Sequence, residues 1–513
     1  MRALGRRAAL LIASSLLVGS WGSAEEASIS RRPPPDYARR LETRLVSAPP
    51  FETTGAESAT GGVDGRVVLD EEIILVRPDG SRLVALHRVL APWTRRGASR
   101  ASRIVHPFLP RTETVHLARA ARVTPDGDRI PVSEHAVFRE TPQPFVDRDI
   151  HVDVAQAVIL LPGVRSGDRV EYVLVTEVEP TFEGELTAFL PVADPWPVER
   201  VRRELILPTA MADRLRADVL ALPGLSRSRE PIGGGESRWV WEAGPVPPQR
   251  LERERAPIRQ VGPGIWLGTL KDWGEVASWY HHLASGSLAP GDELNAEVDH
   301  WALSADVSSV VRELNRRVSN RIENVSVGLG MGSLCPRPPE EVWRSGWGDC
   351  KDQANLLRAL LERAGITAHL ALVNNDHAGR ILTSVPDYRH FNHVIVAVPR
   401  GDGAGYLFCD PTAGAAGDAA LPPSLADRPA LVVRADGGEL IQLPAASPQH
   451  LDLELDLRLT TERELYGWLR ASGGGGQAGA LLGAMAVASE QELERFLNHF
   501  FPAVEVVDAS STT

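Results

Sequence analysis

The hydrophobic pattern of the chain changes its period about half-way along the 513 residues. From about Arg66 to Trp241, short alternating runs of apolar and polar residues are separated by turn sequences such as RPDG and TPDGDR. Alternation with a period of two is typical of strands that bury one face, and Gly, Pro and Asp favour the turns between them. From Thr269, apolar residues recur at helical spacing instead. The sequence therefore predicts an α+β protein that begins with an all-β, sandwich-like domain.

Length and composition allow several domains, because the chain is long and 43% of its residues are apolar. We expect an N-terminal β-sandwich domain over 66–255 and a mixed α+β domain over 265–425. A β-rich module over 430–513 is predicted from LDLELDLRLT, in which Leu alternates with charged residues, and we expect this module to be incomplete. The Pro-rich, polar segment 25–65 predicts a linker with one short helical patch.

The first 24 residues have the features of a secretory signal peptide. Three arginines within the first seven residues precede an apolar run over 8–21 and small residues over 22–24. An N-terminal membrane anchor is the alternative, but the apolar run is short for a span. We therefore expect a bacterial protein that is exported to the periplasm or secreted, with no membrane span after cleavage of the signal peptide.

Charge and ligand patterns exclude some classes of function. The net charge is −12 and no Lys/Arg-rich run is present, which argues against a nucleic-acid partner. His281 and His282 are adjacent, so their side chains point in different directions and make a poor metal pair. No other cluster of metal ligands stands out, and we predict no metal and no cofactor.

Three cysteines, Cys335, Cys350 and Cys409, are too few for a disulfide framework. A disulfide between Cys335 and Cys409 and two independent thiols are both compatible with the sequence. Either arrangement leaves Cys350 as a thiol, so its surroundings decide what it can do.

Cys350 lies at the start of a predicted helix in WGDCKDQANLLRALLERAG, residues 347–365. Asp349 can cap this helix, and Gly365 can end it. Cys350 then lies in the first turn, where unpaired backbone N–H groups and the helix dipole stabilise a thiolate, and Lys351 adds positive charge. A structural cysteine usually lies in an apolar stripe, whereas the neighbours of Cys350 are polar. The sequence therefore predicts a nucleophile.

A nucleophilic cysteine needs a base and a group that orients the base. His393 begins the strand-like HVIVAV, Asp410 ends the strand-like YLFCD, and the Gly-rich loop between them favours a hairpin. If the turn centres between Gly401 and Asp402, His393 lies directly opposite Asp410, with Cβ atoms about 4.5–5.5 Å apart. We therefore predict His393 as the base and Asp410 as the group that orients it.

Two further residues near this hairpin are of types that could take part in the same chemistry. His390, three residues before His393 in RHFNH, is an alternative base, and His393 is favoured because it begins the strand. Cys409 alternates to the face opposite Asp410, which argues against Cys409 as the nucleophile.

Three stretches together resemble the transglutaminase-like superfamily, which is distantly related to the papain-like arrangement: WGDCKDQANLLRALLERAGI, FNHVIVAV and YLFCDPTA. The order Cys, His, Asp and the GDCKD sequence are similar to those of an exported bacterial branch of this superfamily. In that branch an N-terminal β domain of unknown function precedes the transglutaminase-like core. The resemblance implies a transglutaminase-like core with Cys350 as nucleophile, His393 as base and Asp410 as orienting residue. It also implies that Trp343 or Trp347 shapes the oxyanion pocket.

The function implied is that of a thiol enzyme acting on protein or peptide amide bonds through a thioester on the cysteine. Hydrolysis, as in a peptidase or amidase, is slightly favoured over transfer to an amine. The alternative is a catalytically inactive binding or scaffold protein of the cell envelope, whose β domains recognise the partner.

Overall fold

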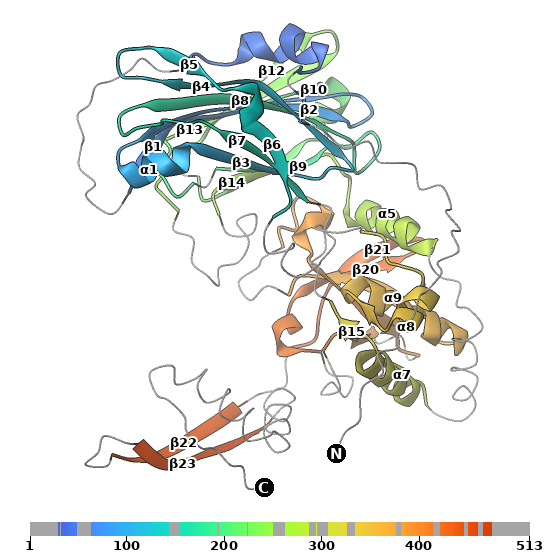
Figure 1. The fold of residues 1–513 in the computed structure, drawn as a ribbon. Coiled ribbons are helices and arrows are strands. Elements are labelled where there is room, and N and C mark those ends of the chain that lie inside the picture. Colours follow the sequence, from blue (N-terminus) through green and yellow to red (C-terminus); the bar gives the residue numbers. More distant parts are fainter. Residues whose placement is uncertain are drawn as a thin grey trace, which may run out of the picture.

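The structure, a computed structural model, describes most of the chain between residues 29 and 474 (Figure 1). The described residues are 29–30, 32–48, 63–142, 154–192, 194–222, 224–249, 262–286, 294, 306–325, 334–375, 381–401, 403, 405–413, 421–445, 450–459 and 465–474. The predicted signal peptide lies outside them. The fold is mixed α+β with several sheets. Within the described ranges, no helix combines the length and apolarity needed to cross a membrane.

The N-terminal domain is built on an eight-stranded sheet of order β12-β13-β10-β1-β2-β8-β4-β5. Its strands are β1 (Gly65–Val76), β2 (Arg82–Pro92), β4 (Glu113–Val123), β5 (Arg129–Pro131), β8 (Arg169–Val178), β10 (Val201–Pro208), β12 (Ser226–Gly233) and β13 (Glu236–Ala243). The β1–β10 pair is parallel, and the other pairs of this sheet are antiparallel.

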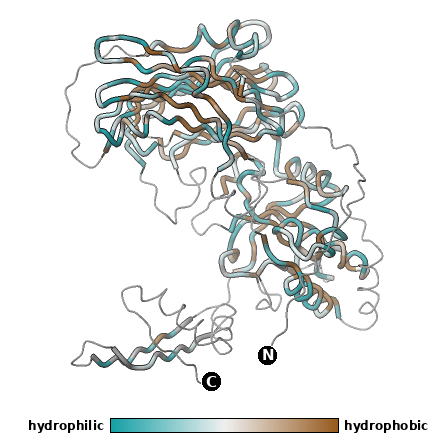
Figure 2. Tube along the Cα trace, in the orientation of Figure 1, coloured by the Kyte–Doolittle hydropathy of each residue, from teal (hydrophilic) through white to brown (hydrophobic). Residues whose placement is uncertain are grey.

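Two three-stranded sheets pack against the inner face of the large sheet. One is β11-β14-β9 and the other is β3-β7-β6, with bounds β3 (Arg103–Phe108), β6 (Val137–Glu140), β7 (Ala155–Leu160), β9 (Thr187–Pro191), β11 (Arg216–Leu220) and β14 (Gly264–Gly268). Short helices α1 (Arg95–Ala101), η3 (Glu134–Ala136) and α3 (Thr209–Ala212) connect the strands. All three sheets contribute to one apolar core around Trp196 and Trp241, and Figure 2 shows hydrophobic residues concentrated along these strands.

Residues 32–48 form an N-terminal strap across the outer face of the large sheet. The strap contains η1 (Tyr37–Leu41) and η2 (Glu42–Arg44), so the predicted helical patch is present. Tyr37 and Leu41 lie four residues apart and insert together into an apolar cluster on the sheet. The prediction of a linker over 25–65 is therefore wrong for this segment, because a polar sequence with two well-spaced apolar residues still packs firmly.

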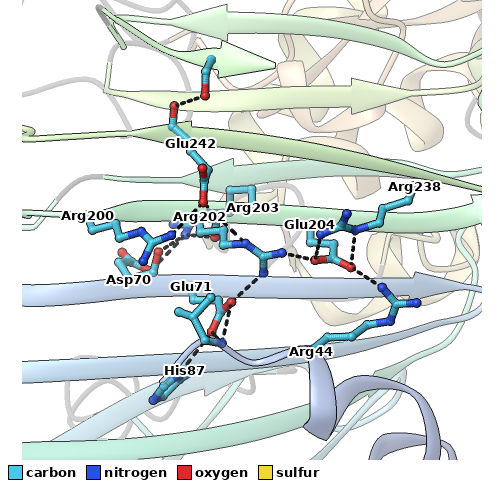
Figure 3. Close-up of polar contacts among 12 residues, drawn as sticks. Arg44, Asp70, Glu71, His87, Arg200, Arg202, Arg203, Glu204, Arg238 and Glu242 are labelled. Atoms are coloured by element: carbon cyan, nitrogen blue, oxygen red, sulfur yellow. Dashed lines mark hydrogen bonds and ion pairs between the residues drawn. The ribbon is translucent and has the colours of Figure 1, made fainter. Parts of the chain in front are cut away.

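Beneath the strap, the same face of the sheet carries a buried network of charged side chains (Figure 3). Arg202 of β10 donates to Glu71 of β1 at 2.6 Å and also pairs with Glu204. Arg44 of the strap reaches Glu204 at 3.0 Å, and the Val46 N–H donates to Glu71 at 3.0 Å. These contacts give the carboxylates partners in a place that water does not reach.

His87 of β2 extends this network between two carboxylates. Its ring nitrogens lie 3.1 Å from Glu71 and 3.2 Å from Glu171, and the ring is fully buried. Burial alone lowers the pKa of His87, but hydrogen bonds to Glu171 and Glu71 outweigh it and raise that pKa above 6.5. Because the folded pKa exceeds the unfolded one, His87 stabilises the domain fully below about pH 6.5 and loses this effect as pH rises through the raised pKa.

We expect His87→Gln to lower the free energy of unfolding by about 2 kcal/mol at pH 5.5, because Gln keeps polar contacts but carries no charge. The difference from the wild type should shrink at pH 9, where His87 contributes less charge. Urea unfolding of the wild type and of His87→Gln at the two pH values measures the difference in the free energy of unfolding. A difference that is the same at both values would contradict a charged His87.

The mixed domain is built on a five-stranded antiparallel sheet of order β19-β18-β17-β20-β21. Its strands are β17 (His369–Val373), β18 (His393–Pro399), β19 (Tyr406–Cys409), β20 (Pro429–Arg434) and β21 (Gly437–Gln442). One face is covered by α5 (Trp273–Ser285) and α9 (Cys350–Arg363), and α7 (Val307–Arg321) and α8 (Pro339–Ser345) pack on α9. The short pair β15 (Glu323–Asn324) and β16 (Trp347–Gly348) and the turns η4 (Tyr388–His390) and η5 (Pro423–Leu425) complete it. The hairpin of β22 (His450–Leu459) and β23 (Leu465–Gly474) forms a separate two-stranded sheet.

Two predicted domain boundaries are wrong. The predicted C-terminal module begins at 430, but β20 and β21 belong to the sheet that carries His393. The predicted mixed domain begins at 265, but β14 pairs with β9 and β11 of the N-terminal domain. Strand patterns in a sequence show that strands exist, while the choice of sheet depends on pairing between distant segments. The part of the predicted module after 474 lies outside the described residues.

Candidate active site

Cys350 is the first residue of α9, as predicted, and its side chain is half-buried. Asp349 caps the helix by accepting a hydrogen bond from the Asp352 N–H at 3.2 Å. Lys351 pairs with Asp349, so its charge is matched by a carboxylate and is not directed at the thiol alone. Burial raises the pKa of Asp349, and the Lys351 charge opposes this effect.

His393 begins β18 and contacts the carboxylate of Asp410. His393 Nε2 lies 2.8 Å from Asp410 Oδ2, and both side chains are buried. Burial alone would lower the pKa of His393, but the charge and hydrogen bond of Asp410, with a hydrogen bond to Cys350, raise it to about 10. Since Nε2 faces Asp410, Nδ1 is the ring nitrogen left for Cys350. The three predicted residues therefore lie together.

Thr412 also belongs to the site, although no sequence pattern marks it. Its N–H and its hydroxyl donate to Asp410 Oδ1 at 3.0 and 2.7 Å. These bonds and the His393 charge outweigh burial and lower the pKa of Asp410. The only signal was a Thr two residues after an Asp, which is typical of an ordinary turn and points to no catalytic role.

The hairpin register differs from the prediction by two residues. Ala397 pairs with Phe408 and Val396 pairs with Cys409, whereas the predicted turn placed Tyr406 opposite Ala397. The predicted direct opposition of His393 and Asp410 is therefore wrong. A shift of two residues keeps every side chain on its face, so the two side chains still meet, now diagonally from beyond the end of β19.

His390, the alternative base, is held in a structural position. Its ring stacks on Trp266 at 4.0 Å between centroids, and its Nε2 lies 3.0 Å from the Val385 carbonyl oxygen. With 1% of its surface exposed, it has no access to a substrate in this arrangement.

All three cysteines lie within the described residues, and none forms a disulfide. Cys409 is buried, and this burial raises the pKa of its thiol to about 12. Cys335 is half-buried, and its thiol lies 3.3 Å from the Leu283 carbonyl oxygen. The sequence was compatible with a Cys335–Cys409 disulfide or with two independent thiols, and the structure has independent thiols.

The two tryptophans proposed for the oxyanion pocket have different surroundings. Trp343 is buried among the helices, with the Arg321 guanidinium 4.2 Å from its ring centroid. Trp347 is 45% exposed, and Arg337 stacks on it at 3.9 Å. Arg337 in turn donates to Asp352 at 2.8 Å, which fixes the stack beside the first turn of α9. Trp347 is thus the one of the two that a substrate can reach.

Within the described parts of the chain, no group of three or more His, Cys, Asp or Glu side chains is arranged to hold a metal ion.

Comparison with known proteins gives one family and several solved structures. Residues 78–250 match the family described as a Domain of Unknown Function with solved structure, DUF3857. No curated protein matches the chain. A solved "putative protease" from Parabacteroides distasonis is 15% identical, with 74% of this chain and 72% of that one covered and a TM-score of 0.60.

Two other structures match with much lower scores. A "putative cysteine protease" from Cytophaga hutchinsonii is 11% identical over 57% of this chain and 88% of that one, with a TM-score of 0.21. An M1 zinc metallopeptidase from Deinococcus radiodurans is 12% identical over 40% and 42%, with a TM-score of 0.22. Such scores do not establish a common fold. The chain therefore contains a DUF3857 match in its β domain and shares its fold with the protein from Parabacteroides distasonis.

Proposed function

We propose that the protein is a transglutaminase-like thiol enzyme that acts on protein or peptide amide bonds, with hydrolysis favoured over transfer to an amine. The observation that carries the proposal is the position of His393, which contacts Asp410 at 2.8 Å through Nε2 and lies near enough to Cys350 for the thiol to help raise the pKa of the imidazole. A fold shared with a protein named as a protease supports the same class of reaction.

The reaction begins with the Cys350 proton already on His393, whose pKa is raised to about 10, and the thiolate sulfur attacks the amide carbonyl carbon. The backbone N–H of Cys350, in the first turn of α9, donates to the oxyanion that forms. The C–N bond then breaks, the amine takes the proton from His393, and a thioester remains on Cys350. Water attacks the thioester with His393 as base, which releases a carboxylic acid and restores the thiol.

Asp410 stabilises the imidazolium between these steps, and exposed Trp347 lines the approach to the sulfur.

We also propose that the enzyme is exported and that its substrates are envelope proteins or peptides. The N-terminal sequence pattern, three arginines before an apolar run, supports export.

The test uses p-nitrophenyl acetate as an acyl donor with the full chain. We expect a burst of p-nitrophenol and the mass gain of one acetyl group on Cys350, followed by slow release of acetate. Cys350→Ala should abolish the burst, whereas Cys335→Ala, which removes the other half-buried thiol, should leave it unchanged. Added methylamine separates the two outcomes, because a transferase forms N-methylacetamide. A burst that survives Cys350→Ala would refute the proposal.

A further inference from the structure

Strand β14 of the N-terminal domain contacts the loop that leads into His393. Trp266 of β14 is fully buried, and its ring stacks on His390 at 4.0 Å with 28° between the planes. At the end of the strand, a Cβ added to Gly268 would lie 2.8 Å from Val385 Cγ1. The ring stack at His390 and the close approach of Val385 to Gly268 place both ends of the segment 385–390 against one strand of the other domain.

The segment that ends at His393 has little freedom of its own. The His390 ring bonds to the Val385 carbonyl, and Asn374 Nδ2 donates to the His390 carbonyl at 2.9 Å. The Asn392 N–H donates to the Val373 carbonyl at 3.0 Å, and the next residue, His393, pairs with Val373. A displacement of His390 therefore passes along three residues of fixed backbone to His393.

Trp273 of α5 holds the same loop from the mixed domain. Its indole N–H donates to the Thr383 carbonyl at 3.1 Å, and its ring lies 5.8 Å from that of His390 and 5.6 Å from that of Phe391. Trp273 supports the loop within its own domain, whereas Trp266 contributes support from the other domain.

We propose that Trp266 is a positioning residue for the reaction, through which the β domain sets the place of the His393 imidazole. The proposal rests on the function proposed above. It gives the N-terminal domain a part in catalysis that needs no substrate contact, because the base is held correctly only when β14 is in place. Misplacement of a catalytic group by about 1 Å can lower the rate about 100-fold. Loss of the ring contact at His390, three residues before His393, can therefore produce a measurable loss of rate.

The test compares Trp266→Leu with Trp266→Phe in the acetylation of Cys350 by p-nitrophenyl acetate. Leu leaves a gap beside His390, so we expect acetylation at pH 7 to slow at least about tenfold and the pH–rate profile to move as His393 loses its fixed contact with Asp410. Phe keeps an aromatic face and should restore the wild-type profile and most of the rate. Trp239→Leu, on β13 of the same domain, is the control and should change neither.

A pH–rate profile of folded Trp266→Leu that superimposes on that of the wild type would overturn the inference and leave the proposed function intact. Absence of acetylation in the wild type itself would instead overturn the proposed function and the inference with it. If Trp266→Leu does not fold, Gly268→Ala provides the readout, because its new methyl group displaces Val385 and leaves Trp266 unchanged. An unmoved profile in that variant would equally refute the inference.

Discussion

Asp410→Asn is expected to slow the acetylation of Cys350 by about 10⁴-fold without unfolding the protein. Thr412 donates two hydrogen bonds to Asp410 Oδ1, so the Asn carbonyl oxygen stays at that position. The Asn NH₂ then faces His393 Nε2 and requires an acceptor, which moves the imidazole proton to Nδ1. Nδ1 is the nitrogen that faces Cys350, so His393 can no longer take the thiol proton.

The same substitution removes the charge that raises the pKa of His393 to about 10, and burial then lowers that pKa. An NMR titration of His393 reports this change independently of the rate. Thr412→Val is the graded control, since it removes one donor to Asp410 and keeps the carboxylate, and we expect a loss of only about tenfold. If Asp410→Asn were no slower than Thr412→Val, the orienting role of Asp410 would be wrong.

Arg202→Met is expected to lower the free energy of unfolding of the N-terminal domain by about 3–5 kcal/mol. Arg202 is 7% exposed and pairs with Glu71 and Glu204, whose side chains have no exposed surface. Met fills much of the same volume but leaves both carboxylates short of a partner in a place without water. The loss is large beside the total stability of a domain, which is about 5–15 kcal/mol.

Arg200→Met is a matched control on the edge of the same network. Arg200 lies two residues away and pairs with Glu242 at 3.0 Å, but the two side chains are 48% and 42% exposed. An exposed pair of this kind contributes about 0–1 kcal/mol. Urea unfolding of the two variants measures the difference, and equal losses would show that burial of the network adds nothing.

Local features of the site could be predicted from the sequence. The cap at Asp349 and the start of α9 at Cys350 follow from a few neighbouring residues, and the structure confirms both. The common face of His393 and Asp410 also follows, because side chains alternate with a period of two and an error of two residues in register does not change the face.

Features that depend on distant pairing could not be predicted. The membership of β20 and β21 in the sheet of His393 is set by contacts with β17. The strap was predicted as a linker because Tyr37 and Leu41 find their partners only on strands far along the chain. Trp266 gave no signal, since an aromatic residue in a strand usually belongs to the core of its own domain.

The strap also has a consequence for the order in which the chain folds. It is synthesised before the strands it covers, yet Arg44 pairs with Glu204, 160 residues later, and Arg40 with Glu236, 196 residues later. Contacts of such long separation form late, because the intervening loop must first be ordered. The first described helical turns of the protein are therefore among the last to dock, and until then the outer face of the large sheet is open to chaperones and to other chains.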